Sequence, residues 1–392
     1  MTGARTGTGV VGVLGGSGVV GRAAARALRE LGVERLRLGG RRLDAVAAVA
    51  AALPGGTDRA SRAVAVDLDA AASLAAFCAG CSVVLNCAGP SYRVRGRVAL
   101  AALAAGAHCV DVAGDDPAYE QLRAVDVAGT GRSVVLSAGM LPGLSGLLPR
   151  WLAQRQQVGG GGRLTVWTGG LERCSRTVAA DLLLSVGGDP SGDPSGHPTD
   201  ATVPFGESLA AWRQGRRVSR ALRAQDGAEL PYFPTSVSLQ PYLSTEAERL
   251  ARALGLDELD WFNVFPGRRV RDLLAALGTG REPLAEAAER LVRAAELDLT
   301  GRRPYFRMVF ALDSPDGAAT AVLGTRDSYR LTAAVGALAV TATLAGTIPA
   351  GLHFAAEVLD PAESVRRLAA TPGVTLDLSH GPVELTSSVG AL

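Results

Sequence analysis

A glycine-rich turn between a predicted strand and a predicted helix most constrains how this chain folds. Residues 10–14 form an apolar run of strand length, and residues 22–31 form an alanine-rich stretch with helical spacing. The spacing G-x-x-G-x-x-G between them places Gly15 in a tight turn, Gly18 where backbone amides can approach a pyrophosphate, and Gly21 where the helix packs on the strand. The free N–H groups that begin such a helix also bind phosphate. The residues expected to bind a dinucleotide here are Gly15, Gly18, Val19, Val20 and Gly21.

The end of the second predicted strand indicates which dinucleotide is bound. Residues 33–38 lead into the sequence Gly-Gly-Arg-Arg at positions 39–42. A domain that binds NAD usually has an acidic residue at this strand end, where it holds the ribose 2′-hydroxyl. Guanidinium groups instead suit the 2′-phosphate of NADP, to which they donate paired hydrogen bonds. We therefore expect Arg41 and Arg42 to select NADP(H). The alternatives are a solvated arginine pair and a glycine turn that binds no ligand.

Strands and helices continue to alternate as far as residue 147, which predicts an α/β fold with a Rossmann-type parallel sheet. In such a sheet the ligand lies at the carboxyl ends of the strands, where the strand order reverses. The third strand ends at Asp67, which either reaches the adenine ring or caps the next helix. The loop after the fourth strand is expected to line the path to the nicotinamide, and it contains Ala88, Gly89 and Pro90.

The composition is that of a globular protein with more than one domain. A length of 392 residues exceeds the size at which a single hydrophobic core usually stops growing. The net charge is +2, and acidic and basic residues are interleaved, so no nucleic acid or membrane surface is expected as a partner. Polar residues interrupt the apolar stretch 335–356, which predicts a buried helix and a turn rather than a membrane span.

The five cysteines do not have the spacing of a disulfide framework. Cys78 and Cys81 form a C-x-x-C pair, but no second pair follows at the spacing of a zinc site. We expect both side chains to pack at the end of a helix, and we expect no metal site; redox or metal chemistry at this pair is the alternative. Reduced thiols, and an N-terminus without a signal-peptide pattern, predict a cytoplasmic protein.

The second half of the chain predicts a mixed sheet with helices. Residues 163–170 have the pattern of a strand, and residues 305–312 and 318–324 that of two strands joined by a turn. Amphipathic helices are predicted at 245–254 and 283–296. Residues 187–206 contain Asp-Pro-Ser-Gly twice and predict a long loop, either a lid or a passive connection.

Several motifs occur in the order found in one family of proteins. Besides the glycine turn and the Gly-Arg-Arg, they are Asn-Cys-Ala-Gly-Pro at 86–90, His-Cys-Val-Asp-Val-Ala-Gly-Asp at 108–115, Ala-Gly-Met-Leu-Pro-Gly at 138–143, Pro-Ala-Gly at 349–351 and Glu-Val-Leu-Asp-Pro at 357–361. Together they resemble the saccharopine dehydrogenase-like (saccharopine reductase-like) NADP-binding oxidoreductases over residues 10–150 and 325–378.

The resemblance implies a Rossmann domain, a second α+β domain with a mixed sheet, and a C-terminal helix that returns to the first domain. The implied boundaries are 1–147 for the NADP-binding domain, 148–325 for a substrate and oligomerisation domain, and 326–392 for a C-terminal segment that packs back on the first domain. A homodimer is expected.

Hydride transfer needs a positioned cofactor and a proton donor near the acceptor atom. Tyr92, shortly after the fourth strand, and Asp115, at the end of the fifth, lie nearest to the expected nicotinamide. The family often has Glu where Asp115 stands. His353, after the long apolar helix, is a third catalytic candidate, and His197 in the 187–206 loop is a fourth. The Tyr-x-x-x-Lys pair of short-chain dehydrogenases is missing from the sequence.

The resemblance implies an NADP-dependent oxidoreductase. We expect a reductase that uses NADPH to reduce a C=N bond of a small-molecule substrate, such as an imine or thiazoline of siderophore or other nonribosomal-peptide biosynthesis, free or tethered to a carrier protein. The alternatives are an enoyl (C=C) reductase of polyketide-lipid biosynthesis, an amino-acid dehydrogenase that acts on a saccharopine-like C–N bond, and a protein that binds NADP without catalysis.

Overall fold

The computed structural model describes residues 9–54, 61–187, 206–277 and 282–381. The chain forms two compact units. The first consists of Met1–Leu147 and Ser328–Thr371, and the second of Leu148–Asp327 and Pro372–Leu392. The loop predicted at 187–206, with His197 in it, lies outside the described residues except for its two ends.

The first unit contains a seven-stranded parallel sheet with the order β16-β6-β5-β4-β1-β2-β3. Its strands are β1 (Val10–Leu14), β2 (Leu36–Gly40), β3 (Ser61–Ala65), β4 (Cys81–Asn86), β5 (His108–Asp111), β6 (Ser133–Leu136) and β16 (Gly351–Phe354). Valine and leucine side chains in the central strands are almost fully buried, as expected where helices cover both faces of a parallel sheet. The predicted α/β fold with a Rossmann-type sheet is confirmed.

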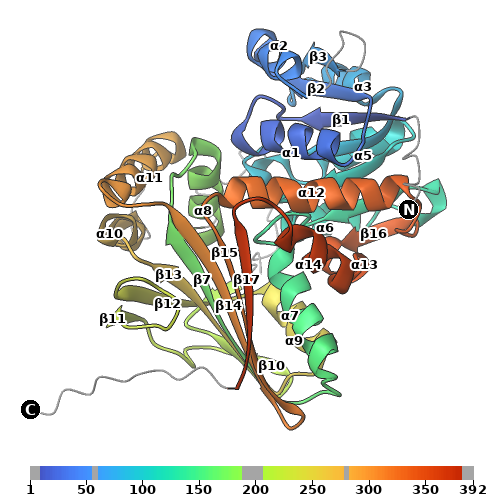
Figure 1. Cartoon of the computed structure of the whole chain (residues 1–392). Coiled ribbons are helices and arrows are strands. Elements are labelled where there is room, and N and C mark those ends of the chain that lie inside the picture. The colour runs from blue at the N-terminus through green and yellow to red at the C-terminus, as the bar shows by residue number, and fades with distance from the viewer. Residues whose placement is uncertain (1–8, 55–60, 188–205, 278–281, 382–392) are drawn as a thin grey trace, which may run out of the picture. The chain divides into compact units, whose positions relative to one another are not determined.

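The helices of the first unit are α1 (Val19–Glu30), α2 (Leu43–Ala51), α3 (Ala71–Cys78), α4 (Ser91–Val94), α5 (Arg97–Ala104), α6 (Asp116–Leu122), α12 (Ser328–Leu344), α13 (Ala355–Val358) and α14 (Pro361–Ala369). Figure 1 shows α1 and α12 packed side by side on one face of the sheet, with α5 behind it. Gly336 permits close packing of α12, because a Cβ there would lie 2.8 Å from a methyl carbon of Val112. The apolar stretch at 335–356 thus contains the buried end of α12 and a turn, as predicted. It also contains the strand β16, which the sequence did not predict.

Cys78 and Cys81 lie at the end of α3 and the start of β4, where both side chains are buried. Burial raises the pKa of the Cys78 thiol to about 11 and also raises the pKa of Cys81. Neutral thiols of this kind are poor nucleophiles and poor metal ligands. The buried positions of Cys78 and Cys81 agree with the prediction that both side chains pack at a helix end.

The second unit contains a mixed sheet of ten strands. Along the sheet the order is β10-β9-β13-β7-β14-β15-β17. β12 lies off this path and pairs with β13, β11 and β8. The strands are β7 (Arg163–Leu171), β8 (Gly206–Ser208), β9 (Ala211–Arg213), β10 (Arg216–Val218), β11 (Gln225–Ala228), β12 (Val237–Ser244), β13 (Glu258–Phe265), β14 (Tyr305–Ser314), β15 (Gly317–Thr325) and β17 (Val374–His380). Only β7 and β13 pair in parallel; the other described pairs are antiparallel.

Both faces of this sheet are apolar at its centre. On one face Trp167 stacks on Phe262 with ring centroids 6.2 Å apart, and on the other Trp261 meets the edge of Phe310. The second unit begins within α7 (Leu144–Gln156). Its other described helices are α8 (Arg176–Gly187), α9 (Thr245–Leu254), α10 (Arg268–Leu277) and α11 (Leu284–Leu299). α11 packs against α8 and α10 and also contacts β7, whereas α9 packs against β12 and β13.

The end of the chain divides between the two units. Residues 328–371 belong to the first unit, whereas the resemblance implied a C-terminal segment of 326–392. Residues 374–380 instead form β17, which pairs with β15 throughout its length in the second unit. Pairing between β15 and β17 is non-local, and local sequence patterns carry no signal for it.

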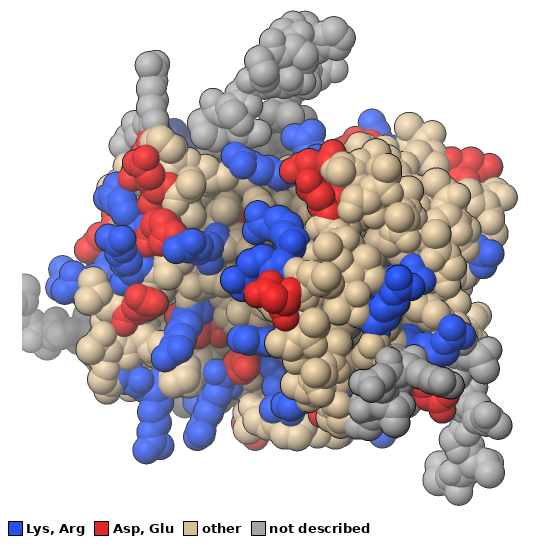
Figure 2. Space-filling view, turned by 90° about the horizontal axis from the view of Figure 1, so that it is seen from above, with Lys and Arg blue, Asp and Glu red and all other residues tan. Residues whose placement is uncertain are grey.

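Acidic and basic side chains lie beside one another on part of the face shown in Figure 2, and uncharged residues cover much of the rest. The balanced net charge of +2 is therefore not separated into surfaces of a single sign on this face. Among the described residues, no helix is both long enough and apolar enough to span a membrane.

Candidate cofactor site

The carboxyl ends of the parallel strands form one edge of the first sheet, and the strand order reverses there between β1 and β4. Loops leave the two strands in opposite directions at such a point, which is where parallel sheets of this type bind nucleotides. The loop after β1 touches the loop after β4. A Cβ on Gly15 would lie 2.8 Å from the carbonyl carbon of Cys87. The two glycine-containing loops predicted to bind cofactor are thus neighbours.

The turn between β1 and α1 requires glycine at two positions for different reasons. Gly15 has a φ of +76°, which side chains other than glycine rarely adopt. Gly21 has ordinary helical geometry, but a Cβ on it would lie 2.1 Å from the carbonyl oxygen of Gly15. The helix therefore packs against the turn itself, rather than against the strand as the sequence suggested.

The start of α1 can accept an anion. The first intrahelical hydrogen bond runs from the Arg22 amide to the Gly18 carbonyl at 3.0 Å, so the amides of Val19, Val20 and Gly21 have no partner within the helix. No acidic residue lies in the first turn of α1. A Cβ on Gly18 would meet only the Gly15 carbonyl oxygen, at 3.1 Å, so the space beside Gly18 is otherwise open. Open space and unpaired amides fit a bound pyrophosphate.

Arg41 and Arg42 follow β2 directly, and both side chains are exposed. The glycine turn lies next to this strand end, since a Cβ on Gly40 would be 3.4 Å from the Ser17 hydroxyl. Within the described part of the chain, neither arginine forms an ion pair or a side-chain hydrogen bond. Two guanidinium groups beside the pyrophosphate position fit the 2′-phosphate of NADP.

Replacing both arginines with alanine is expected to weaken NADPH binding roughly 30-fold, or about 2 kcal/mol, because the 2′-phosphate loses its charged hydrogen bonds. NADH lacks this phosphate, so its affinity should change less than threefold. Titration of nicotinamide fluorescence with the Arg41→Ala/Arg42→Ala variant measures both. An equal loss for NADPH and NADH would show that the arginines do not contact the 2′-phosphate.

A buried hydrogen-bond network joins the ends of β4 and β5. Asn86 Nδ2 donates to Asp111 Oδ2 at 2.7 Å, and Asn86 Oδ1 accepts from the Ala88 amide at 3.1 Å. Asp111 Oδ1 accepts from the amides of Ala113 and Gly114 at 3.0 and 2.7 Å. Burial raises the pKa of the Asp111 carboxyl, while these donors oppose the shift. The two side chains thus fix the loops at the candidate nicotinamide end of the edge.

Sequence reasoning did not assign a role to Asn86 and Asp111, although both lie in motifs that it used. The available signal was that a polar residue ends each of two neighbouring parallel strands. The loop after β6 joins the same region, where Ser137 donates through its amide and its hydroxyl to the Gly114 carbonyl at 2.6 and 3.0 Å.

The remaining residues predicted in the β4 loop lie at this edge. The Ala88 amide donates to Asn86 Oδ1, and the Gly89–Pro90 peptide is cis. Tyr92 lies in the short helix α4 directly after it and is half-buried. Asp115 precedes α6, and its carbonyl accepts from the amides of Ala118 and Tyr119 at 2.9 Å. Tyr92 and Asp115 thus follow the neighbouring strands β4 and β5, and their role as proton donors stays a prediction.

The structure places His353 away from this group, whereas Asp67 follows β3 at the carboxyl ends of the strands, as predicted from the sequence. His353 lies in β16, and its Nε2 is 3.1 Å from the Pro349 carbonyl oxygen, so the ring turns back toward the amino end of the strand. That end belongs to the opposite edge of the sheet. Asp67 accepts a hydrogen bond from the Asp69 amide at 3.0 Å, so its exposed carboxylate takes part in a local turn before α3.

Residues 11–128 match the family model described as the saccharopine dehydrogenase NADP binding domain. The chain covers 100% of the apo saccharopine dehydrogenase (L-Glu forming) from Saccharomyces cerevisiae, with 95% of its own length aligned, 16% identity and a TM-score of 0.63. A myo-inositol dehydrogenase from Corynebacterium glutamicum aligns over 94% of this chain and 98% of its own, with 11% identity and a TM-score of 0.45. A search of curated proteins found no match. The domain match supports NADP(H) as the cofactor of an oxidoreductase.

Proposed function

We propose that this chain, which carries a saccharopine dehydrogenase NADP-binding domain at residues 11–128, is a reductase that uses NADPH to reduce a C=N bond. The observation that carries the proposal is the match of residues 11–128 to the saccharopine dehydrogenase NADP binding domain, because the resemblance to that family implies chemistry at a C–N bond. The yeast protein with the same fold over 95% of the chain is named as a saccharopine dehydrogenase, which is consistent with chemistry at nitrogen.

The reaction balances with one hydride and one proton. When bound, NADPH would supply a hydride for the imine carbon, and a proton must reach the nitrogen to give the amine. Gly18 and the first amides of α1 would hold the pyrophosphate, and Arg41 and Arg42 would hold the 2′-phosphate. The Asn86–Asp111 pair holds the loops that carry Tyr92 and Asp115. These two side chains are the proposed sources of the proton.

The substrate is proposed to be an imine or thiazoline of a secondary-metabolite pathway, free or attached to a carrier protein. We expect a cyclic imine to be reduced with NADPH, and an enoyl thioester to be reduced at least about 100-fold more slowly. Oxidation of NADPH, followed at 340 nm, measures both. The reverse preference would favour the enoyl reductase, and NADPH binding without turnover of either compound would favour a protein that only binds the nucleotide.

A further inference from the structure

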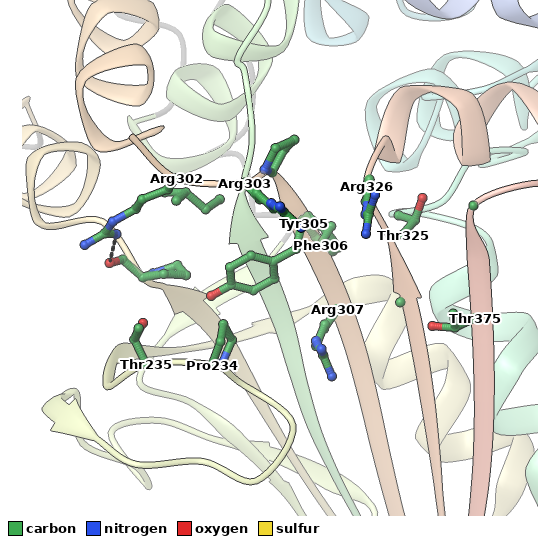
Figure 3. Close-up of a pocket in the computed structure, with 15 residues that line it drawn as sticks. Pro234, Thr235, Arg302, Arg303, Tyr305, Phe306, Arg307, Thr325, Arg326 and Thr375 are labelled. Carbon is green, nitrogen blue, oxygen red and sulfur yellow. Dashed lines mark hydrogen bonds between the residues drawn. The ribbon is translucent and has the colours of Figure 1, made fainter. Parts of the chain in front are cut away.

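A pocket of about 550 Å³ lies within the second unit, at the amino end of β14 and the carboxyl end of β15. Figure 3 shows four arginine side chains around it. Arg302, Arg303 and Arg307 come from the start of β14 and the segment before it, and Arg326 follows β15. Thr325, next to Arg326, also lines the pocket, as do Thr235 and Thr375 from two other segments.

The charges around this pocket are all of one sign. No acidic residue is among the described residues that line it. None of the four guanidinium groups forms an ion pair within the described part of the chain, and Arg302 Nη1 donates to the Pro266 carbonyl oxygen at 3.3 Å. Four like charges around one cavity repel one another, and a bound anion would offset that repulsion.

The sheet leaves room for a ligand beside Arg307. In the strand register, Arg307 stands opposite Gly324 on β15 and Gly169 on β7. Residues directly opposite on a sheet are the closest side-chain neighbours, so two glycines leave the guanidinium without such neighbours. A Cβ on Gly324 would lie 2.7 Å from the Thr375 hydroxyl oxygen, so that hydroxyl occupies the space over the glycine. Arg307 and Thr375 thus border the same space.

Tyr305 adds a buried polar group to the pocket. Its hydroxyl oxygen is shielded from solvent and has no hydrogen bond of normal geometry with a described residue. Burial raises the pKa of this phenol, against opposing contributions from Arg307, Arg302 and the nearby Thr235 side chain. A buried hydroxyl without a partner costs roughly 1–3 kcal/mol, so a ligand that accepts its hydrogen bond would be stabilised.

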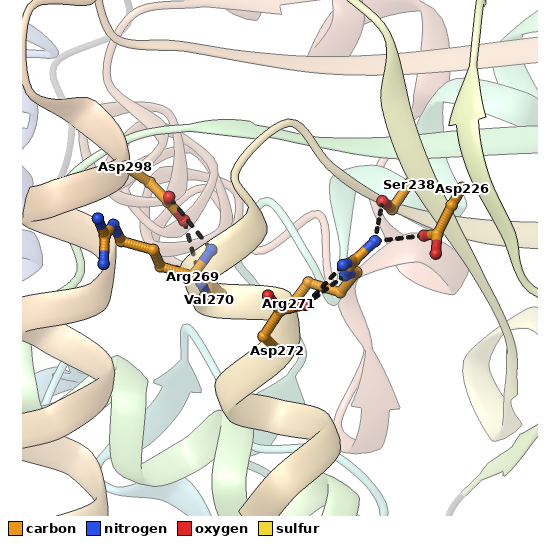
Figure 4. Close-up of polar contacts among 7 residues, drawn as sticks. All are labelled: Asp226, Ser238, Arg269, Val270, Arg271, Asp272 and Asp298. Carbon is orange, nitrogen blue, oxygen red and sulfur yellow. Dashed lines mark hydrogen bonds and ion pairs between the residues drawn. The ribbon is translucent and has the colours of Figure 1, made fainter.

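Arg271, in the same unit, shows how this chain neutralises an arginine that has a structural role. Figure 4 shows Arg271 on α10 between Asp226, Asp272 and Ser238. Its Nη1 donates to Ser238 Oγ at 2.9 Å and forms an ion pair with Asp226, and its Nη2 lies 2.6 Å from Asp272 Oδ1. The arginines of the pocket lack such carboxylates, which distinguishes them from a structural ion-pair cluster.

We propose that this pocket binds an oxyanion, a carboxylate or phosphate group that the substrate carries. The clustered guanidinium groups donate to the oxyanion in pairs, and the Thr375 hydroxyl beside Arg307 adds a further hydrogen bond. The identification of the ligand as substrate rests on the proposed reductase function, whereas anion binding itself does not. A free metabolite would supply the anion as a carboxylate, and a carrier-bound substrate would supply it as the phosphodiester of its prosthetic arm.

Calorimetric titration of the full chain with glutarate, inorganic phosphate and 4′-phosphopantetheine tests the pocket without any turnover. We expect binding of at least one of these anions, and a loss of roughly 30-fold or more in the Arg303→Gln/Arg307→Gln variant. Arg293→Gln, which removes an exposed charge from α11, is the matched control and should change the affinity less than twofold. NADPH affinity measured on the same samples checks that the variants remain folded.

The outcomes separate the sources of the anion and the two proposals. Tighter binding of glutarate indicates a free carboxylate substrate, and tighter binding of phosphopantetheine indicates a carrier arm; both support the oxyanion site. Binding of none of the anions at millimolar concentration, or equal binding by the double variant and the wild type, would overturn it. Anion binding without reduction of any imine would support this site while contradicting the proposed reaction.

Discussion

Replacing Asn86 with aspartate is expected to lower the free energy of unfolding by about 3 kcal/mol or more. The change places a carboxylate where an amide now donates to Asp111 at 2.7 Å, in a site where both side chains are almost fully buried. Two carboxylates cannot both remain ionised at this distance in a buried site, so one must take up a proton or the loops must separate. Either outcome also disturbs the loop containing Ala88, and NADPH affinity should fall with stability.

Exchanging the two residues should restore most of that stability. In the variant Asn86→Asp/Asp111→Asn, the new amide at 111 can donate to the new carboxylate at 86. The carboxylate can still accept from the Ala88 amide, and the amide oxygen at 111 can still accept from Ala113 and Gly114. Donors and acceptors therefore match again in the exchanged pair, as in a double-mutant cycle with a large coupling energy.

Urea unfolding of the wild type, both single variants and the exchanged pair measures this coupling. Asp111→Asn alone should also be destabilised, because its NH₂ group then faces the NH₂ group of Asn86 or displaces the loop amides. If the exchanged pair is no more stable than the sum of the two single changes predicts, the Asn86–Asp111 hydrogen bond does not hold the two loops.

The strength of a local signal decided which elements could be predicted from the sequence. The β1–turn–α1 unit combines an apolar strand, glycines at fixed spacing and a helical period within about 20 residues, and all of these agree. β16 is only four residues long, and its pairing with β6 joins segments more than 200 residues apart. The Ser133 hydroxyl also bonds to the Pro349 carbonyl at 2.8 Å. Contacts of this kind depend on the completed sheet, and the local sequence does not reveal them.

The same distinction applies to the candidate sites. Gly15 and Gly21 could be identified because backbone geometry restricts their residue type. His353 was a candidate only because it follows a long helix, and the direction of its ring, toward Pro349, depends on β16. The arginine pocket is assembled from segments near residues 235, 305, 325 and 375. In a chain whose basic residues are arginines throughout, no single segment of the sequence distinguishes these four from the others.

The glycine turn offers a test that separates the ligand's requirement for glycine from the fold's requirement. Gly18→Ala places a methyl group in otherwise open space at a φ of −70°, so the unliganded protein should change in stability by less than about 1 kcal/mol. The pyrophosphate must approach this same space, and NADPH affinity should fall at least about tenfold. Gly21→Ala instead forces a methyl group to within 2.1 Å of the Gly15 carbonyl oxygen. The cost should be about 3 kcal/mol, since backbone must move to relieve the overlap.

Thermal unfolding without ligand, together with NADPH titration, measures the two effects separately. Gly159→Ala is the matched control, because a methyl group there meets nothing within 4 Å and neither measurement should change. Gly21→Ala should lose both stability and NADPH affinity, the latter at least about 100-fold, because the shifted turn moves the amides of α1. An unchanged affinity in Gly18→Ala would place the pyrophosphate away from α1. That result would contradict nucleotide binding at the reversal point between β1 and β4, even if Gly21→Ala behaved as expected.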